Sequence, residues 1–68
     1  LSITHRNIPN MVRQITRAIA EEEANIVDML NKSRGELAYT LIDIEDEISE
    51  FVIKNIEQVE GILKVRVL

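Results

Sequence analysis

The spacing of hydrophobic residues predicts six secondary-structure elements along the chain. Residues 1–4 alternate apolar and polar side chains, which is typical of a strand. Residues 9–22 follow the spacing of an amphipathic helix, with apolar side chains at Met11, Val12, Ile15 and Ile19. We expect Pro9 in the first helical turn, because its missing backbone N–H would have no intrahelical partner there.

The middle of the chain predicts a hairpin. Residues 26–33 place polar side chains on both faces, which favours an edge strand, and one face would carry Ile26, Asp28, Leu30 and Lys32. Gly35 would supply the positive φ of a tight reversal over residues 34–36. Residues 37–44 carry apolar side chains on both faces, as a central strand does. Because two helices do not easily cover both faces of so small a sheet, we expect a second molecule or domain to cover part of it.

The last third of the chain predicts a second helix and a fourth strand. Acidic residues 45–47 suit a helix start, since the helix dipole favours negative charge there. The helix should end before Gly61 and bury its apolar positions, Ile48, Phe51, Val52, Ile56 and Val59. Residues 62–68 alternate, which predicts a strand with Leu63, Val65 and Val67 inward and Lys64 and Arg66 outward.

The order of these elements is βαββαβ. Each βαβ half needs a right-handed crossover, so both helices should lie on the same face of one antiparallel sheet. We therefore predict an α+β, ferredoxin-like sandwich with strand order 4-1-3-2, formed by a single domain over residues 1–68. The chain opens without an initiator methionine, and we interpret it as a piece of a longer cytosolic, and so cytoplasmic, polypeptide.

Composition narrows the expected partners. The 68 residues are 46% hydrophobic but only 3% aromatic, so the core must be aliphatic. A chain this short without cysteine often completes its burial by association. The net charge of −4 argues against nucleic acid as a partner. No apolar run approaches the roughly 20 residues of a membrane-spanning helix, so we expect no membrane partner.

Catalysis finds little support in the residues. The chain has one histidine, no cysteine, no glycine-framed serine and no phosphate-binding glycine pattern. A metal site would need more than His5 and scattered carboxylates. We therefore predict no catalytic residue, metal or cofactor here, and a domain that is not an enzyme by itself.

Residues 5–10 form the best candidate for a small-ligand site. They join the first strand to the first helix, whose free N–H groups carry partial positive charge and attract carboxylates. His5 and Asn7 flank this corner. The alternative is structural: His5 ends the strand and bonds to its own turn, Pro9 starts the helix, and Asn7 forms a turn or a cap.

Asn25 lies at the start of the predicted edge strand. Asparagine tolerates left-handed backbone, so conformation alone is one explanation for it. If two copies pair along this strand, Asn25 of one copy approaches the corner of the other. An intersubunit pocket with amide donors and an anion-attracting helix end would result.

Several stretches together resemble a known family. They read His5-Arg6-Asn7-Ile8-Pro9-Asn10-Met11-Val12, Ala24-Asn25-Ile26, Asp28-Met29-Leu30-Asn31-Lys32-Ser33-Arg34-Gly35, Ala38-Tyr39-Thr40-Leu41-Ile42-Asp43 and the closing residues 61–68. This pattern resembles an ACT domain, and more narrowly the C-terminal regulatory ACT domain of bacterial D-3-phosphoglycerate dehydrogenases. The Asn-Lys-Ser-Arg-Gly hairpin followed by Ala-Tyr-Thr-Leu points to the dehydrogenase.

The resemblance implies a homodimer and a ligand. ACT domains of two subunits would join through residues 26–33, and L-serine would bind between them and inhibit serine biosynthesis by feedback. The contacts would fall on His5, Asn7 and Asn25, with the carboxylate held by backbone N–H groups near Ile8, Pro9, Asn10 and Met11. The NAD-dependent oxidoreductase chemistry of the parent enzyme would lie outside these residues.

Asn10 departs from the family pattern, because ACT domains commonly have glycine there. Its side chain would either crowd the ligand or add a hydrogen bond. Two other functions stay open: a dimerisation module without a ligand, and an ACT domain of another amino-acid enzyme such as a serine dehydratase.

Overall fold

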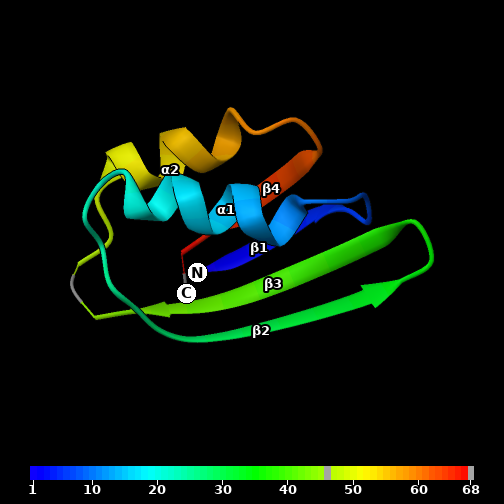
Figure 1. Ribbon diagram of the computed structural model, residues 1–68, viewed down its shortest axis with the longest axis horizontal. Coiled ribbons are helices and arrows are strands. Elements are labelled where there is room, and N and C mark those ends of the chain that lie inside the picture. The colour runs from blue at the N-terminus through cyan, green and yellow to red at the C-terminus, as the bar shows by residue number, and fades with distance from the viewer. Residues whose placement is uncertain (46, 68) are drawn as a thin grey trace.

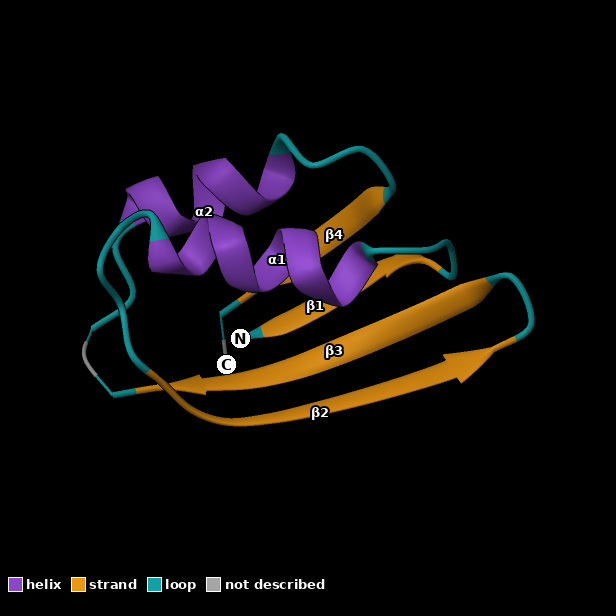
Figure 2. Cartoon of the chain, viewed as in Figure 1, coloured by secondary structure: helices purple, strands orange, loops and turns teal. Residues whose placement is uncertain are grey.

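The computed structural model describes residues 1–45 and 47–67. The elements are β1 (Ser2–Arg6), α1 (Met11–Ala20), β2 (Ile26–Arg34), β3 (Leu37–Ile44), α2 (Glu50–Glu57) and β4 (Ile62–Arg66). The strands form one antiparallel sheet in the order β2-β3-β1-β4, and both helices lie over the same face of it (Figures 1 and 2). The predicted ferredoxin-like fold and strand order are confirmed.

The core between the helices and the sheet is aliphatic, as predicted. Its most deeply buried side chains are isoleucines, each at most 1% exposed: Ile3, Ile15, Ile19, Ile42 and Ile56. Both aromatic residues lie outside the core, since Tyr39 is 41% exposed and Phe51 65%. Phe51 was expected on the buried face of the second helix, and that prediction is wrong. Val52 and Ile56 fill the narrow contact of this short helix with the core, and Phe51 points to solvent.

Helix α1 is shorter than the predicted residues 9–22. Asn10 has a left-handed backbone, with φ of 66°, and helical hydrogen bonding begins with the Gln14 N–H donating to the Asn10 carbonyl at 3.0 Å. This turn of the chain leaves Pro9 before the helix, so its predicted place in the first helical turn is wrong. At the other end the helix stops at Ala20, before the acidic residues 21–23.

Helix α2 also begins later than predicted. Its N-cap is Ser49, whose hydroxyl oxygen accepts a hydrogen bond from the Val52 N–H at 3.3 Å. Glu45 and Glu47 precede the helix, so the expected start at residues 45–47 is wrong there, while Asp46 lies outside the described residues. The serine cap decides the boundary because it satisfies a first-turn donor that a more distant carboxylate would leave free.

Two register shifts interrupt the predicted alternation. In β2, Ile26 pairs with Ile44 but Asp28 with Asp43, so Ile26 and Asp28 lie on opposite faces instead of sharing one. A second shift, in the pairing of β1 with β4, leaves Leu63 unpaired and 55% exposed. The inward prediction for Leu63 is therefore wrong, as it is for Val67, which is 58% exposed just beyond the strand.

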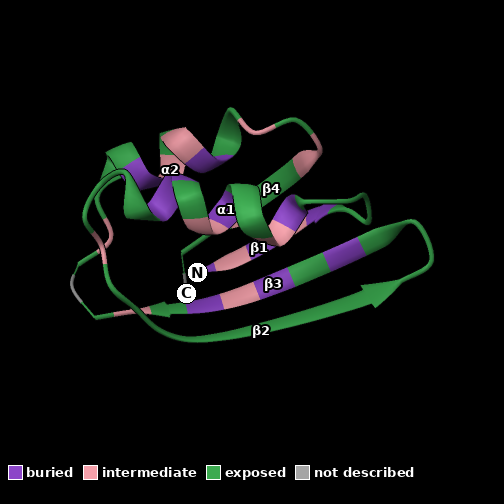
Figure 3. Ribbon diagram, viewed as in Figure 1, coloured by how far each residue is buried: buried purple, intermediate pink, exposed green. Residues whose placement is uncertain are grey.

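The two strands of the hairpin have the predicted positions. β3 is central, β2 is an edge strand, and the turn between them contains Gly35 with φ of 64°. Every residue of β2 is exposed along its whole length (Figure 3). Within residues 1–45 and 47–67, no helix is long and apolar enough to cross a membrane.

Candidate functional site

The corner between β1 and α1 lies beside the turn of the β2–β3 hairpin, at one end of the sheet (Figure 1). Asn7 joins the two segments: its backbone N–H donates to the Glu36 carbonyl at 2.8 Å, and its Nδ2 donates to the Gly35 carbonyl at 3.0 Å. Between them is a hollow of about 330 Å³, which Arg6 and Ile8 also line. The predicted corner is therefore a real concavity at the surface.

Gly61, in the connection between α2 and β4, packs against the corner. Its carbonyl accepts a hydrogen bond from the Arg6 N–H at 2.8 Å, and its φ of 99° favours glycine. A Cβ at this position would lie 3.1 Å from Cδ1 of Ile8 and 3.2 Å from Sδ of Met11. The sequence indicated Gly61 only as a helix-ending residue. Its contacts with Ile8 and Met11 join residues that are distant in sequence, so no local pattern predicts them.

The start of α1 meets the corner with its backbone donors uncapped. Among the described residues, the Asn10 side chain makes no capping hydrogen bond. The first-turn N–H groups of a helix have no intrahelical acceptor, so those of residues 11–13 can receive an anion. The left-handed backbone of Asn10 suits asparagine, because asparagine is the residue after glycine that best tolerates this conformation.

His5 lies inside the fold and not on the corner surface. Its side chain is only 2% exposed, Nδ1 is 2.9 Å from the Arg6 carbonyl oxygen, and Nε2 is 2.9 Å from Oγ1 of Thr40. Oγ1 of Thr40 is in turn 2.9 Å from Oδ1 of Asn31 on the edge strand. Both ring nitrogens of His5 thus have partners within the chain. The bond to the Arg6 carbonyl is the predicted structural alternative, and the bond to Thr40 is additional.

The hydrogen bonds of His5, Thr40 and Asn31 form one continuous chain. A carbonyl oxygen only accepts, so Nδ1 of His5 carries a proton. Thr40 donates its one proton to Oδ1 of Asn31, and its oxygen lies within hydrogen-bond distance of Nε2 of His5. His5 is therefore linked through Thr40 to the Asn31 amide on the edge strand. The only sequence signal for Thr40 was a hydroxyl within an otherwise apolar row.

Asn25 lies at the opposite end of the sheet from the corner (Figure 1). Its carbonyl accepts from the Glu45 N–H at 3.0 Å, and its Nδ2 donates to Oε2 of Glu45 at 3.2 Å. The backbone of Asn25 is not left-handed. The residue with positive φ in the connection between α1 and β2 is Glu23. Within one chain, then, Asn7 and Ile8 line the hollow, whereas His5 lies inside the fold, residues 9–11 are not among the lining residues, and Asn25 lies at the other end of the sheet.

Comparison with known proteins leaves the family open. No protein-family model matches the chain, and no curated protein matches it either. The chain is a small βαββαβ domain with ferredoxin-like topology. Among the residues described, no group of three or more His, Asp or Glu side chains is placed to hold a metal ion.

Proposed function

We propose that this chain is a regulatory ACT domain that binds L-serine between two copies and inhibits a parent phosphoglycerate dehydrogenase by feedback. The observation that carries the proposal is the exposed edge strand β2, which ends beside the hollow at the corner. The identity of the ligand, L-serine, is inferred from the resemblance of residues 5–12 and 24–43 to that family.

Strand β2 has the character of an edge that pairs with another chain. It is nine residues long, and its apolar side chains are exposed by 36% at Ile26, 66% at Val27, 38% at Met29 and 47% at Leu30. Soluble proteins normally shorten, charge or cover such an edge, because its free N–H and C=O groups recruit further strands. A second copy of β2 would satisfy these groups and continue the sheet across the edge.

Antiparallel pairing about a two-fold axis would complete the pocket. It places the start of one β2 beside the end of the other, so Asn25 of one copy approaches Gly35 of its partner. Gly35 contacts Asn7 at the corner in each chain, at 3.0 Å. The two ends of the sheet, distant within one chain, would then form two equivalent sites.

The corner suits a small amino acid. The uncapped start of α1 would bind its carboxylate, and amide groups of Asn7 and of Asn25 from the second copy would bind its ammonium and hydroxyl groups. His5 would hold the strand end from inside the fold. Serine that binds only the paired form stabilises one subunit arrangement, with a coupling free energy of typically about 1–3 kcal/mol.

Calorimetry with L-serine tests this proposal, with D-serine and glycine as comparison ligands. The dimer is first confirmed by its mass in solution. L-serine should bind with the greatest heat, Asn25→Ala should abolish the heat, and the matched change Asn55→Ala on α2 should leave it unchanged. Leu30→Lys, at the centre of β2, should yield a monomer that binds no serine. A dimer that takes up none of the three ligands at millimolar concentration would falsify the proposal.

A dimerisation module without a ligand is the second candidate. It is favoured by the internal bonds of the corner, since both ring nitrogens of His5 and Nδ2 of Asn7 already have partners. It predicts the same dimer and the same effect of Leu30→Lys, but no heat with any amino acid. The calorimetric titration therefore separates the two candidates.

A further inference from the structure

The face of the sheet that points away from the helices, here called the open face, has a regular arrangement of side chains. Residues paired across an antiparallel sheet point to the same side, so the register orders this face into rows. The rows are Arg34, Leu37 and Arg6; Lys32, Tyr39, Thr4 and Lys64; Leu30, Leu41, Ser2 and Arg66; and Asp28 and Asp43.

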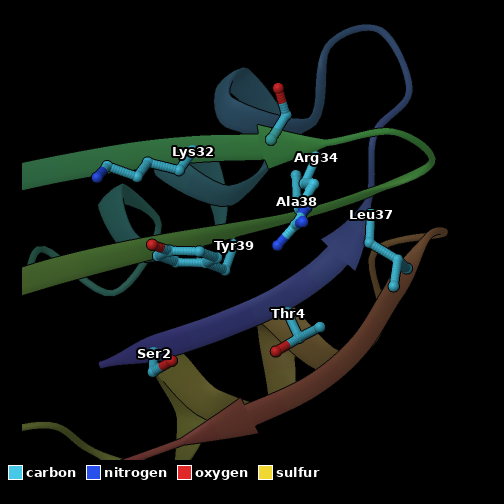
Figure 4. A pocket seen from close by; sticks show the side chains of 8 residues that line it. Ser2, Thr4, Lys32, Arg34, Leu37, Ala38 and Tyr39 are labelled. Carbon is cyan, nitrogen blue, oxygen red and sulfur yellow. The ribbon is translucent and has the colours of Figure 1, made fainter.

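The centre of the open face is apolar and lies open to solvent. Leu37 is 52% exposed, Tyr39 41% and Leu30 47%. A hollow of about 570 Å³ lies here, with the Tyr39 ring on one side and the hydroxyls of Ser2 and Thr4 on the other (Figure 4). Contiguous apolar surface surrounded by polar groups is characteristic of sites that bind other proteins.

The rim of the open face is basic although the chain is acidic. Five of the eight lysines and arginines stand here, namely Arg6, Lys32, Arg34, Lys64 and Arg66, against Asp28 and Asp43 in the last row. Within the described residues, none of the five forms an ion pair. Charge is thus segregated: the cations gather on one face of a chain whose net charge is −4.

We propose that the open face is a docking surface for an acidic, partly apolar polypeptide segment of a partner protein. Its carboxylates would pair with the basic rim, and its apolar side chains would cover Leu37 and Tyr39. This function goes beyond the proposed one, because it needs neither serine nor pairing through β2.

Other occupants fit the same surface less well. A second copy facing it across a two-fold axis would bring cations against cations. Nucleic acid would leave the exposed leucines unused and would find Tyr39 as the one aromatic platform on this face. The acidic segment is the occupant that uses both the apolar centre and the basic rim.

The chain contains its own probe for the experiment. Tyr39 is the single tyrosine and there is no tryptophan, so tyrosine fluorescence reports directly on the open face. We would titrate the chain with a short peptide of alternating glutamate and leucine, and with its lysine–leucine counterpart. The acidic peptide should change the Tyr39 emission and bind more weakly as salt is raised, whereas the basic peptide should not bind.

Charge reversal on two faces supplies a matched control. Lys32→Glu with Arg34→Glu should weaken binding of the acidic peptide by about tenfold, because rim charges contribute modestly each. Arg13→Glu with Arg17→Glu on α1 makes the same change in net charge and should leave the affinity unaltered. Lys64→Glu with Arg66→Glu on β4 should also weaken binding, which excludes an indirect effect through β2 and keeps the test valid if the first variant fails to fold.

The apolar centre is tested with a labelled peptide, so that the readout does not depend on tyrosine. Tyr39→Ala should weaken binding, and Phe51→Ala, which removes the exposed aromatic ring of α2, should not. Equal binding of the two peptides, or undiminished binding by the folded sheet variants, overturns the proposal. So does tighter binding of single-stranded RNA or of phosphatidylserine vesicles to this face. A normal heat with L-serine in the β4 variant would separate the two proposals.

Discussion

The two faces of the sheet are built from the same strands and differ in exposure along β1 and β3. On the face under the helices, Ala38 and Ile42 of β3 are 4% and 1% exposed. On the open face, their neighbours Leu37 and Tyr39 are exposed by 52% and 41%. Because side chains alternate along a strand, each strand contributes to both environments. What separates the faces is only the layer of helices above one of them.

The polar groups of the two faces show the same contrast. Under the helices, His5 and Thr40 are buried and bond to each other, because a buried polar group without a partner is costly. On the open face, Lys32 and Arg34 extend into solvent and need no partner in the chain. The covered face thus holds the buried polar bonds, and the charged side chains of the open face stay solvated.

The largest expected effect comes from cutting into the covered face. Ile42, on the covered face of β3, is 1% exposed, so Ile42→Ala should lower the free energy of unfolding by about 2–5 kcal/mol, through lost burial and the cavity left behind. Leu37→Ala on the open face is the matched control and should cost less than about 1 kcal/mol. Urea unfolding at one fixed protein concentration measures both, and equal losses would contradict the contrast.

The polar contrast is tested by two threonines. Thr40→Val keeps the shape but removes the partner of His5, and should lower the free energy of unfolding by about 1–3 kcal/mol. Thr4→Val, on the open face of β1, should change it by less than about 0.5 kcal/mol. Both values come from urea unfolding near neutral pH; a tolerant Thr40 would mean that the buried bonds are dispensable.

A substitution at the corner, where the chain passes from the sheet to the helix layer, should change the free energy of unfolding by a smaller amount. Asn10 has φ of 66°, so Asn10→Ala should cost about 1 kcal/mol, since alanine lacks the short polar side chain that lets asparagine tolerate left-handed backbone. Asn10→Gly should be close to neutral, because glycine adopts this conformation freely. Thermal unfolding distinguishes the pair, and similar losses for both would show that the asparagine side chain itself matters.

The smallest effect is expected for single charges on the open face. Lys64→Gln should change the free energy of unfolding by less than about 0.5 kcal/mol, with the sign toward stabilisation, since it removes one of several like charges. Raising the salt concentration should abolish the gain by screening. A clear loss of stability would mean that Lys64 makes a contact within the domain.

The fold was predictable from the sequence because its signals are periodic and local. Alternation over residues 37–44 and helical spacing around Ile15 led to the right element order, sheet order and central strand. The errors fall where one residue breaks a period. Leu63 is exposed because the register shift leaves it unpaired. The left-handed Asn10 makes α1 begin after Pro9. No periodicity reveals such single-residue events.

The candidate site was predictable only in part, for the same reason. Residues 5–10 form one continuous stretch, so the corner could be located in the sequence. The bond between His5 and Thr40 spans 35 positions in the sequence. Gly61 packs against Ile8, although the two lie near opposite ends of the chain. These contacts depend on the pairing of β1 with β3 and β4, which no local pattern contains.

By itself, the sequence determined the βαββαβ order, an aliphatic core, an exposed edge at residues 26–33 and a polar corner before the first helix, since each depends on neighbours along the chain. The tertiary structure decided that His5 is buried, that Asn25 lies at the opposite end from the corner, and that five cations share the open face. Those properties depend on strand register, which brings together residues that are distant in sequence and sets which side of the sheet each one occupies.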